Sequence, residues 1–102
     1  AVDIIQPNVG RVGGITEWIK VANLAQSFNV QLAPHAFLLV HLHLACSQPN
    51  LKAIESVDTE YELDKVLYTE IPQPDKGILS PFPDKYGLGL ELNPYTLQKW
   101  SI

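Results

Sequence analysis

The chain has 102 residues, which allows one domain at most. Hydrophobic residues make up 46% of it, too many for a disordered chain, and the net charge of −4 with no basic block argues against a nucleic-acid surface. No apolar run approaches the roughly 18–20 residues of a membrane span, and the first residues lack a signal-peptide pattern. We therefore expect a cytoplasmic protein without a nucleic-acid or membrane partner, whose sequence begins inside a domain.

The first element is a short β-rich run at residues 2–6, which ends at Pro7 because proline cannot continue a central ladder. Gly13 and Gly14 then predict a turn that leads into a helix. Thr16 is the expected N-cap of that helix.

The following helix is predicted from apolar residues that recur every three or four positions and form one stripe. Glu17 suits its positive end, and Asn29 suits the left-handed conformation that closes a helix. The residues of the stripe are Ile15, Trp18, Ile19, Ala22, Ala25 and Phe28.

Two more strand-like runs follow, at residues 31–33 and 51–54, separated by a helical segment at 37–47 that is apolar nearly all round. His35 comes just after the first of these runs, and Glu55 ends the second. The alternation of strand and helix over about 55 residues predicts parallel strands joined by right-handed crossovers.

The pattern changes after Glu55. Residues 56–64 are acidic and polar and are expected to be solvated, and residues 65–70 are expected to form a strand. Residues 71–89 are rich in Pro, Gly, Asp and Lys, which indicates an ordered loop. A short helix is predicted at residues 94–100, with Asn93 as its cap and Pro94 at its first position.

Three polar residues fall at or just past strand ends: Asn8, His35 and Glu55. The carboxyl ends of parallel strands converge on one face, where such folds bind and react with ligands. The spacing therefore suggests the rim of an active site. Taken singly, a histidine after a proline is more often a polar loop residue, and a strand-end glutamate is more often solvated.

Other conspicuous residues have plainer interpretations. His41 and His43 lie two positions apart in a helix, so they do not make a metal pair and are expected to be structural. Trp18 is expected to pack in the core. Cys46 has no partner for an internal disulfide and is expected to be a buried, inert thiol.

In combination the motifs resemble the C-terminal barrel region of the enolase superfamily, in its mandelate racemase and acid-sugar dehydratase branch. They are QPNVGRVGGITEW at 6–18, APH at 33–35, HLHLACSQPN at 41–50, Glu55, and PFPDKYGLGLELN at 81–93. The resemblance implies an α/β fold, part of a (β/α)7β TIM-type barrel. Residues 1–56 would supply the sixth, seventh and eighth strands with the two helices between them. Residues 57–102 would be a return segment that leads back to a capping domain.

The resemblance also implies chemistry: Mg²⁺-dependent removal of the proton next to the carboxylate of a hydroxy acid or acid sugar, through an enediolate. Dehydration is the expected outcome, and racemisation is the alternative. By the same resemblance His35 is the general base or acid, and Glu55 faces the developing oxyanion. Asn8 stands where the related enzymes place an aspartate that pairs with the histidine. Asp3 is no substitute, because it lies at the opposite end of its strand.

The amide of Asn8 changes what His35 can be expected to do. An aspartate orients the imidazole and stabilises its protonated form. The amide oxygen of Asn8 could still accept the ring N–H, as asparagine does in other enzymes, but it brings no charge. We therefore expect base catalysis at His35 to be weakened or retuned, or His35 to act mainly as an acid.

A closed barrel of this kind needs about 250 residues. The resemblance places the Mg²⁺ ligands on the third to fifth strands, upstream of this chain, so no metal is expected on the isolated chain. We expect the chain alone to be inactive and to depend on a missing N-terminal part or on self-association. A different class also remains open: a non-catalytic, truncated or degenerate chain that acts as an oligomerising structural module.

Overall fold

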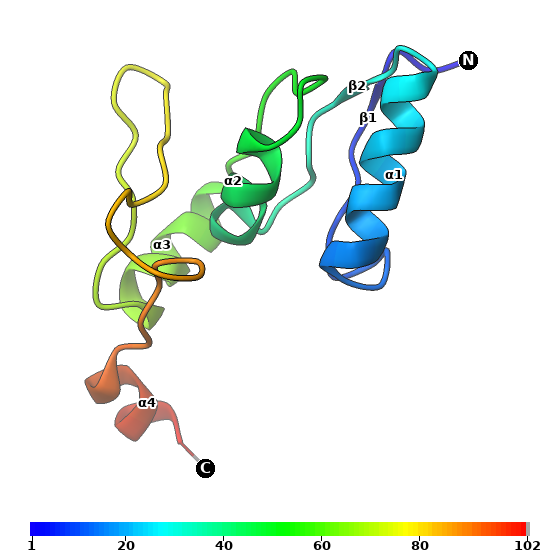
Figure 1. Ribbon diagram of the computed structural model, residues 1–102. Coiled ribbons are helices and arrows are strands. Elements are labelled where there is room, and N and C mark those ends of the chain that lie inside the picture. Colours follow the sequence, from blue (N-terminus) through cyan, green and yellow to red (C-terminus); the bar gives the residue numbers. More distant parts are fainter. Residues whose placement is uncertain (102) are drawn as a thin grey trace. The chain divides into compact units, whose positions relative to one another are not determined.

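The computed structural model describes residues 1–101, which divide into two compact units, one of residues 1–56 and one that begins at Val57 (Figure 1). The first unit contains β1 (Ile4–Ile5), α1 (Ile15–Ser27), β2 (Gln31–Leu32) and α2 (Leu38–Cys46). The second contains α3 (Asp58–Leu67) and α4 (Pro94–Trp100). Within residues 1–101, no helix has the length and apolar character needed to cross a bilayer.

Parallel pairing holds the first unit together, as the strand–helix alternation predicts. β1 pairs with β2 in a parallel register that places Ile5 opposite Leu32. On the other side of β2, Leu32 makes a parallel bridge to Leu51. The third run is shorter than the predicted strand at residues 51–54, because Leu51 is its only bridged residue. The run nevertheless stays beside the segment that follows β2, because the backbone N–H of Glu55 donates to the carbonyl of Pro34 at 3.4 Å.

The start of α1 differs from the prediction, and its end agrees with it. The N-cap is Gly14, at φ 102° and without a side-chain cap, whereas the sequence predicted Thr16. Thr16 cannot cap the helix because it already lies inside the first turn. Glu17 does lie in that turn, and Asn29, at φ 56°, does take the left-handed conformation beyond the helix.

The core of the first unit lies between α1, which runs beside β1 and β2 in Figure 1, and the residues that join these elements. Trp18, Ala22 and Ala25 are buried, and the indole N–H of Trp18 donates to the carbonyl of Pro7 at 3.2 Å. The predicted apolar stripe is therefore only half buried. Its outer members are exposed, to 48%, 36% and 73% for Ile15, Ile19 and Phe28.

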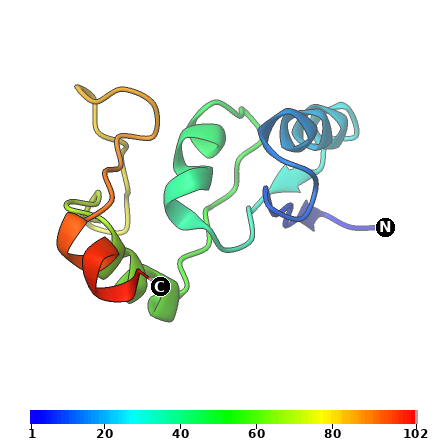
Figure 2. The ribbon, with the colours of Figure 1, turned by 90° about the horizontal axis from the view of Figure 1, so that it is seen from below.

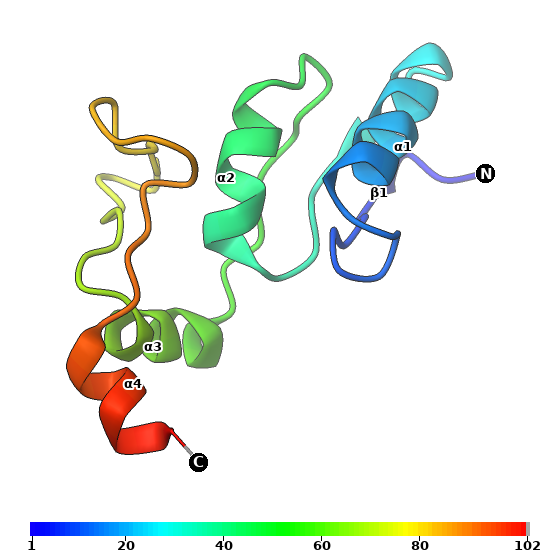
Figure 3. The ribbon, with the colours of Figure 1, turned by 60° about the horizontal axis from the view of Figure 1, so that its bottom comes forward.

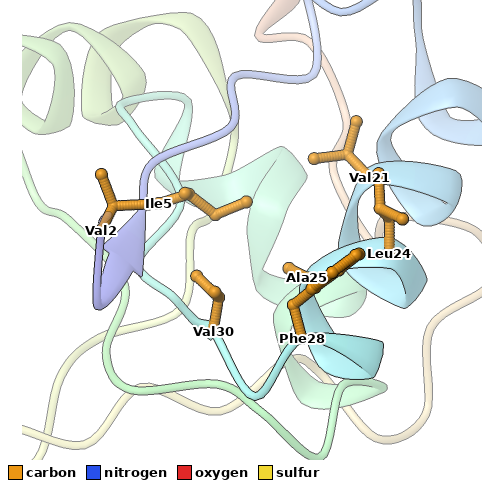
Figure 4. A pocket seen from close by; sticks show the side chains of 7 residues that line it. All are labelled: Val2, Ile5, Val21, Leu24, Ala25, Phe28 and Val30. Carbon is orange, nitrogen blue, oxygen red and sulfur yellow. The ribbon is translucent and has the colours of Figure 1, made fainter.

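An apolar pocket of about 230 Å³ opens between β1 and α1 (Figure 4). The side chains that line it carry no polar group. They come from β1 and its flank, from α1, and from the segment that links α1 to β2: Val2, Ile5, Val21, Leu24, Ala25, Phe28 and Val30. Several of them, such as Leu24 and Phe28, are largely exposed, so this face carries apolar surface that the first unit itself does not bury.

The helix α2 is as apolar and as buried as its sequence predicts, and its buried residues include His41. The prediction for Cys46 was wrong, because its thiol belongs to an exposed residue. Cys46 is the last residue of α2, where the chain turns toward the exposed Ser47, so the burial of the helix stops just before it.

The second unit contains a helix where the sequence predicts a solvated segment and a strand. The predicted strand at residues 65–70 is instead the last turn of α3 and a single antiparallel bridge, Tyr68 to Leu92. Charge explains the helix: Asp58 and Glu60 lie in its first turn and Lys65 in its last, which complements the helix dipole. Lys65 also pairs with Glu62, one turn earlier, at 2.6 Å.

The end of the chain is held by the predicted cap. The side-chain oxygen of Asn93 accepts a hydrogen bond from the backbone N–H of Tyr95 at 3.0 Å, and Pro94 opens α4. The hydroxyl of Thr96 donates to the carbonyl of Val66 at 2.7 Å, which fastens α4 to α3. Figures 2 and 3 show the two helices side by side, while residues 70–92 leave α3 and return to α4.

Candidate active site

The structure brings the three predicted residues together in the first unit. Asn8 follows β1, His35 follows β2, and Glu55 follows the bridge at Leu51. The amide nitrogen of Asn8 lies 3.3 Å from Nδ1 of His35, and Nε2 of His35 lies 4.0 Å from Oε2 of Glu55. We call this arrangement the Asn8–His35–Glu55 row. His35 is the middle member, and its side chain is 43% exposed, which leaves it accessible to a small molecule.

The side chain of Asn8 is buried and its amide is fully hydrogen-bonded. The amide oxygen accepts from the backbone N–H groups of Gly10 at 2.9 Å and Arg11 at 3.2 Å. The amide nitrogen donates to the backbone carbonyl of His35 at 3.1 Å and contacts the ring of His35. This arrangement contradicts the expectation that the amide oxygen accepts the ring N–H. The oxygen is already used to close the turn that follows β1.

The chain turns sharply after His35, at two consecutive residues in the left-handed region. Ala36 has φ 54° and Phe37 has φ 45°, a conformation that costs of order 1–3 kcal/mol for each residue other than glycine. Two side chains hold this turn. The backbone N–H of Ala36 donates to Oε2 of Glu55 at 2.9 Å, and the carbonyl of Ala36 accepts from Nδ1 of His41 at 2.7 Å. Glu55 is therefore fixed beside His35 by the backbone of the next residue.

His41 is fully buried and joins the turn after β1 to the turn after His35. Its Nε2 accepts from the backbone N–H of Val9 at 3.0 Å, so the proton of the neutral ring is on Nδ1, which donates to Ala36. Burial lowers the pKa of His41 below 6.5, and the nearby charge of His35 acts in the same direction, while the bond to Ala36 opposes them. The predicted structural role is confirmed, although the sequence did not show which segments His41 joins.

Another pocket, of about 370 Å³, borders Asn8 and His35 and is also lined by Gln6, Pro7, Arg11 and Val12, and we call it the Arg11 pocket. Arg11 was not predicted to belong to the site. A signal was present, because it is the single arginine of the chain and lies inside the strand-end motif. A guanidinium group binds carboxylates through paired hydrogen bonds, so the pocket combines an anion-binding group with an imidazole.

The row does not fit a Mg²⁺ site by itself. Mg²⁺ takes six oxygen ligands in near-octahedral geometry. The row offers one carboxylate, and the amide oxygen of Asn8 is already occupied by two backbone N–H groups. Within residues 1–101, no three side chains of the types His, Cys, Asp and Glu gather closely enough to hold a metal ion.

Comparison with known proteins gives consistent matches. The family model described as enolase C-terminal domain-like matches residues 1–96. The chain is 33% identical over 101 residues to the L-talarate/galactarate dehydratase of Salmonella typhimurium. This match covers 99% of this chain and 24% of that enzyme.

Solved structures agree with this match. The L-talarate dehydratase of Polaromonas sp. JS666, complexed with Mg and L-glucarate, is 34% identical with a TM-score of 0.82, over 96% of this chain and 26% of that one. A mandelate racemase/muconate lactonizing enzyme-like protein of Rubrobacter xylanophilus is 31% identical with a TM-score of 0.88, and the match covers 95% of this chain and 27% of that one. The chain thus spans about a quarter of the length of these relatives. It belongs to the enolase C-terminal domain-like family, as the resemblance of its motifs implies.

Proposed function

We propose that this chain is the C-terminal barrel portion of a Mg²⁺-dependent enzyme that removes the proton next to the carboxylate of an acid sugar and then eliminates water. The observation that carries the proposal is the Asn8–His35–Glu55 row, at the carboxyl ends of neighbouring parallel strands. Its relatives include dehydratases of talarate and galactarate, which are hydroxylated diacids.

In this proposal each polar group of the site meets a different part of the substrate. His35 and Glu55 face the oxygen atoms next to the reacting carbon, since both side chains are partly exposed and lie 4.0 Å apart. Arg11 binds a carboxylate of the substrate from the wall of the Arg11 pocket. Mg²⁺ would be held by residues from outside this chain and would supply Lewis-acid stabilisation of negative charge.

The missing part of the barrel is proposed to cover the apolar pocket between β1 and α1 (Figure 4). Parallel strands of a barrel are buried on both faces by neighbouring elements. The exposed Leu24 and Phe28 at this pocket are consistent with a further strand and helix that pack there. Residues 1–56 then supply the last three strands and residues 57–102 the return to a capping domain. Self-association of the chain is the alternative way to cover this surface.

Two other functions each have one observation in their favour. The likeness to a mandelate racemase/muconate lactonizing enzyme-like protein, with a TM-score of 0.88, favours racemisation. The asparagine at position 8, in place of the aspartate that the resemblance implies, favours a non-catalytic module. The reaction products distinguish dehydration from racemisation. Dehydration gives a keto-acid, and racemisation gives a stereoisomer of the substrate.

The test is an assay of the complete protein with Mg²⁺ and a panel of acid sugars, in which keto-acid product is measured. We expect His35→Gln and Glu55→Gln each to lower kcat by roughly 10²–10⁴-fold, the usual contribution of a positioned acid or base. Glu62→Gln, on the exposed surface of α3, is the matched control and should leave kcat unchanged. Turnover that survives both changes in the row would contradict the proposal, as would a complete protein that acts on none of the acid sugars.

A further inference from the structure

We propose that Asn8 fixes His35 in the neutral form that carries its proton on Nε2, so that His35 donates a hydrogen bond to a substrate oxygen instead of accepting the substrate's proton. The inference rests on the proposed function, because it assigns a role to His35 within that site. It is carried by the orientation of one amide group, which is fixed by contacts on both of its ends.

The first step is that the amide of Asn8 has only one satisfactory orientation. Its oxygen faces two N–H donors, those of Gly10 and Arg11, and its nitrogen faces the carbonyl of His35. Rotating the amide by 180° would place its N–H groups against those two donors and its oxygen against the carbonyl. A buried polar group that loses its partner costs about 1–3 kcal/mol, so the rotated form is excluded by three contacts at once.

The second step follows from the chemistry of an amide nitrogen, which donates hydrogen bonds and accepts none. The nitrogen of Asn8 lies 3.3 Å from Nδ1 of His35, so Nδ1 must be the acceptor and cannot carry a proton. The proton of the neutral ring is then on Nε2. A doubly protonated ring would direct its Nδ1–H at the N–H of Asn8, so the charged form loses this contact.

An aspartate at position 8 would impose the opposite arrangement. A carboxylate accepts the proton of Nδ1, which leaves a lone pair on Nε2 and stabilises the charged ring once Nε2 has taken up a proton. With Asn8, Nε2 has no free lone pair. Proton uptake there requires the ring to give up its contact with Asn8 first.

The surroundings of the ring fit a donor at Nε2. Oε2 of Glu55 lies 4.0 Å from Nε2 of His35, and it is anchored by the N–H of Ala36. Arg11 lines the same pocket as His35, and the buried His41 uses its Nε2 to accept from the N–H of Val9. A donor on His35 beside an acceptor on Glu55 suits one substrate hydroxyl, which can accept from the first and donate to the second.

The consequence for the reaction is that the base which removes the proton lies elsewhere in the complete enzyme. Racemisation through two bases needs a proton acceptor on each side of the reacting carbon, whereas elimination of water needs one acceptor for the carbon-bound proton and one donor that protonates the departing hydroxyl. The inference therefore favours dehydration over racemisation. Asn8 itself is a positioning residue, because it acts through His35.

Neutron crystallography of the complete, perdeuterated enzyme tests the inference directly, because it locates the deuterium on each ring nitrogen. We expect His35 to carry deuterium on Nε2 alone. His41 is an internal control with the opposite form, since it should carry deuterium on Nδ1 alone. Deuterium on Nδ1 of His35, with or without deuterium on Nε2, would overturn the inference.

The variant Asn8→Asp adds a functional readout: exchange of the proton next to the substrate carboxylate with solvent deuterium. We expect deuterium on Nδ1 of His35 in this variant and an exchange rate at least about 10-fold higher, because Nε2 then becomes a base. Deuterium on Nδ1 without faster exchange would overturn the link between the ring form and basicity. A complete enzyme that acts on no acid sugar would refute the proposed function, while the neutron result would still decide the position of the proton.

Discussion

Asn8 uses its amide oxygen to close the turn after β1 and its amide nitrogen to contact His35. The convergence of Asn8, His35 and Glu55 could be predicted, because strand ends can be located from prolines and apolar runs and parallel strands end on one face. The orientation of the amide could not. It depends on where the N–H groups of Gly10 and Arg11 point, and that is decided by the fold of the turn.

Arg11 allows a test of substrate binding at the scale of one side chain. Arg11→Met in the complete enzyme removes the charge and keeps much of the length, so we expect KM for an acid sugar to rise about 10-fold, the loss of a charge-assisted hydrogen-bonded contact. kcat should change less, since the guanidinium group binds the substrate without taking part in proton transfer. Lys20→Met, on the exposed face of α1, is the control. An unchanged KM for Arg11→Met would show that the pocket does not hold the carboxylate.

His41 links the site to the stability of the first unit through pH. Because burial lowers its pKa in the folded state, the unfolded chain takes up a proton near pH 6.5 while the folded chain does not. This contribution to stability is therefore complete above about pH 6.5 and declines as the pH falls below that value. Denaturant unfolding at a series of pH values gives the free energy of unfolding of the wild type and of His41→Gln. Groups that titrate in both proteins cancel in the difference between them. This difference should shrink as the pH falls below about 6.5. Parallel stability curves for the two proteins would contradict the assignment.

His41→Gln should also lower stability at pH 7, where the ring is neutral. Its two bonds connect the N–H of Val9 and the carbonyl of Ala36, and a buried group left without its partner costs about 1–3 kcal/mol. The midpoint of urea unfolding measures this loss. A variant as stable as the wild type at pH 7 would mean that glutamine or water replaces both bonds.

At the scale of elements, α1 and α4 were predicted more accurately than α3, and the reason is physical. α1 has an apolar stripe with helical spacing, and α4 has an asparagine cap followed by proline. α3 has no buried residue, and its acidic residues led to the prediction of a solvated segment in place of a helix. Its stability comes from charges placed along the dipole and from the bond between Thr96 and Val66, a partner 30 residues away that the local sequence does not reveal.

The cap of α4 gives a prediction for the second unit. Asn93→Ala removes the oxygen that accepts the N–H of Tyr95, so the free energy of unfolding should fall by about 1 kcal/mol. Asn93→Asp keeps an acceptor at the cap and is the matched control, expected to stay close to the wild type. Thermal unfolding followed by far-ultraviolet circular dichroism measures both. Equal losses for the alanine and aspartate variants would show that the side-chain oxygen does not stabilise the helix.

At the scale of the whole molecule, the first unit combines polar groups at its strand ends with an uncovered apolar pocket between β1 and α1. The chain spans about a quarter of the length of its relatives, and its own residues do not gather into a metal site within the described part. These observations fit a chain that contributes one part of a larger active site. The family could be predicted from the motifs, but the substrate could not, because an imidazole, a carboxylate and a guanidinium group can bind many different hydroxylated acids.

The most direct test that this chain is one part of an acid-sugar dehydratase is the fate of galactarate in deuterated water with Mg²⁺. Proton NMR follows it for the complete protein and, in parallel, for residues 1–102 alone. We expect the complete protein to form a keto-acid, removal of Mg²⁺ by a chelator to stop the reaction, and residues 1–102 alone to form no keto-acid. The related hydroxylated diacids L-talarate and glucarate complete the panel. Mg²⁺-dependent turnover by residues 1–102 alone, or a complete protein that leaves every acid sugar unchanged, would contradict this proposal.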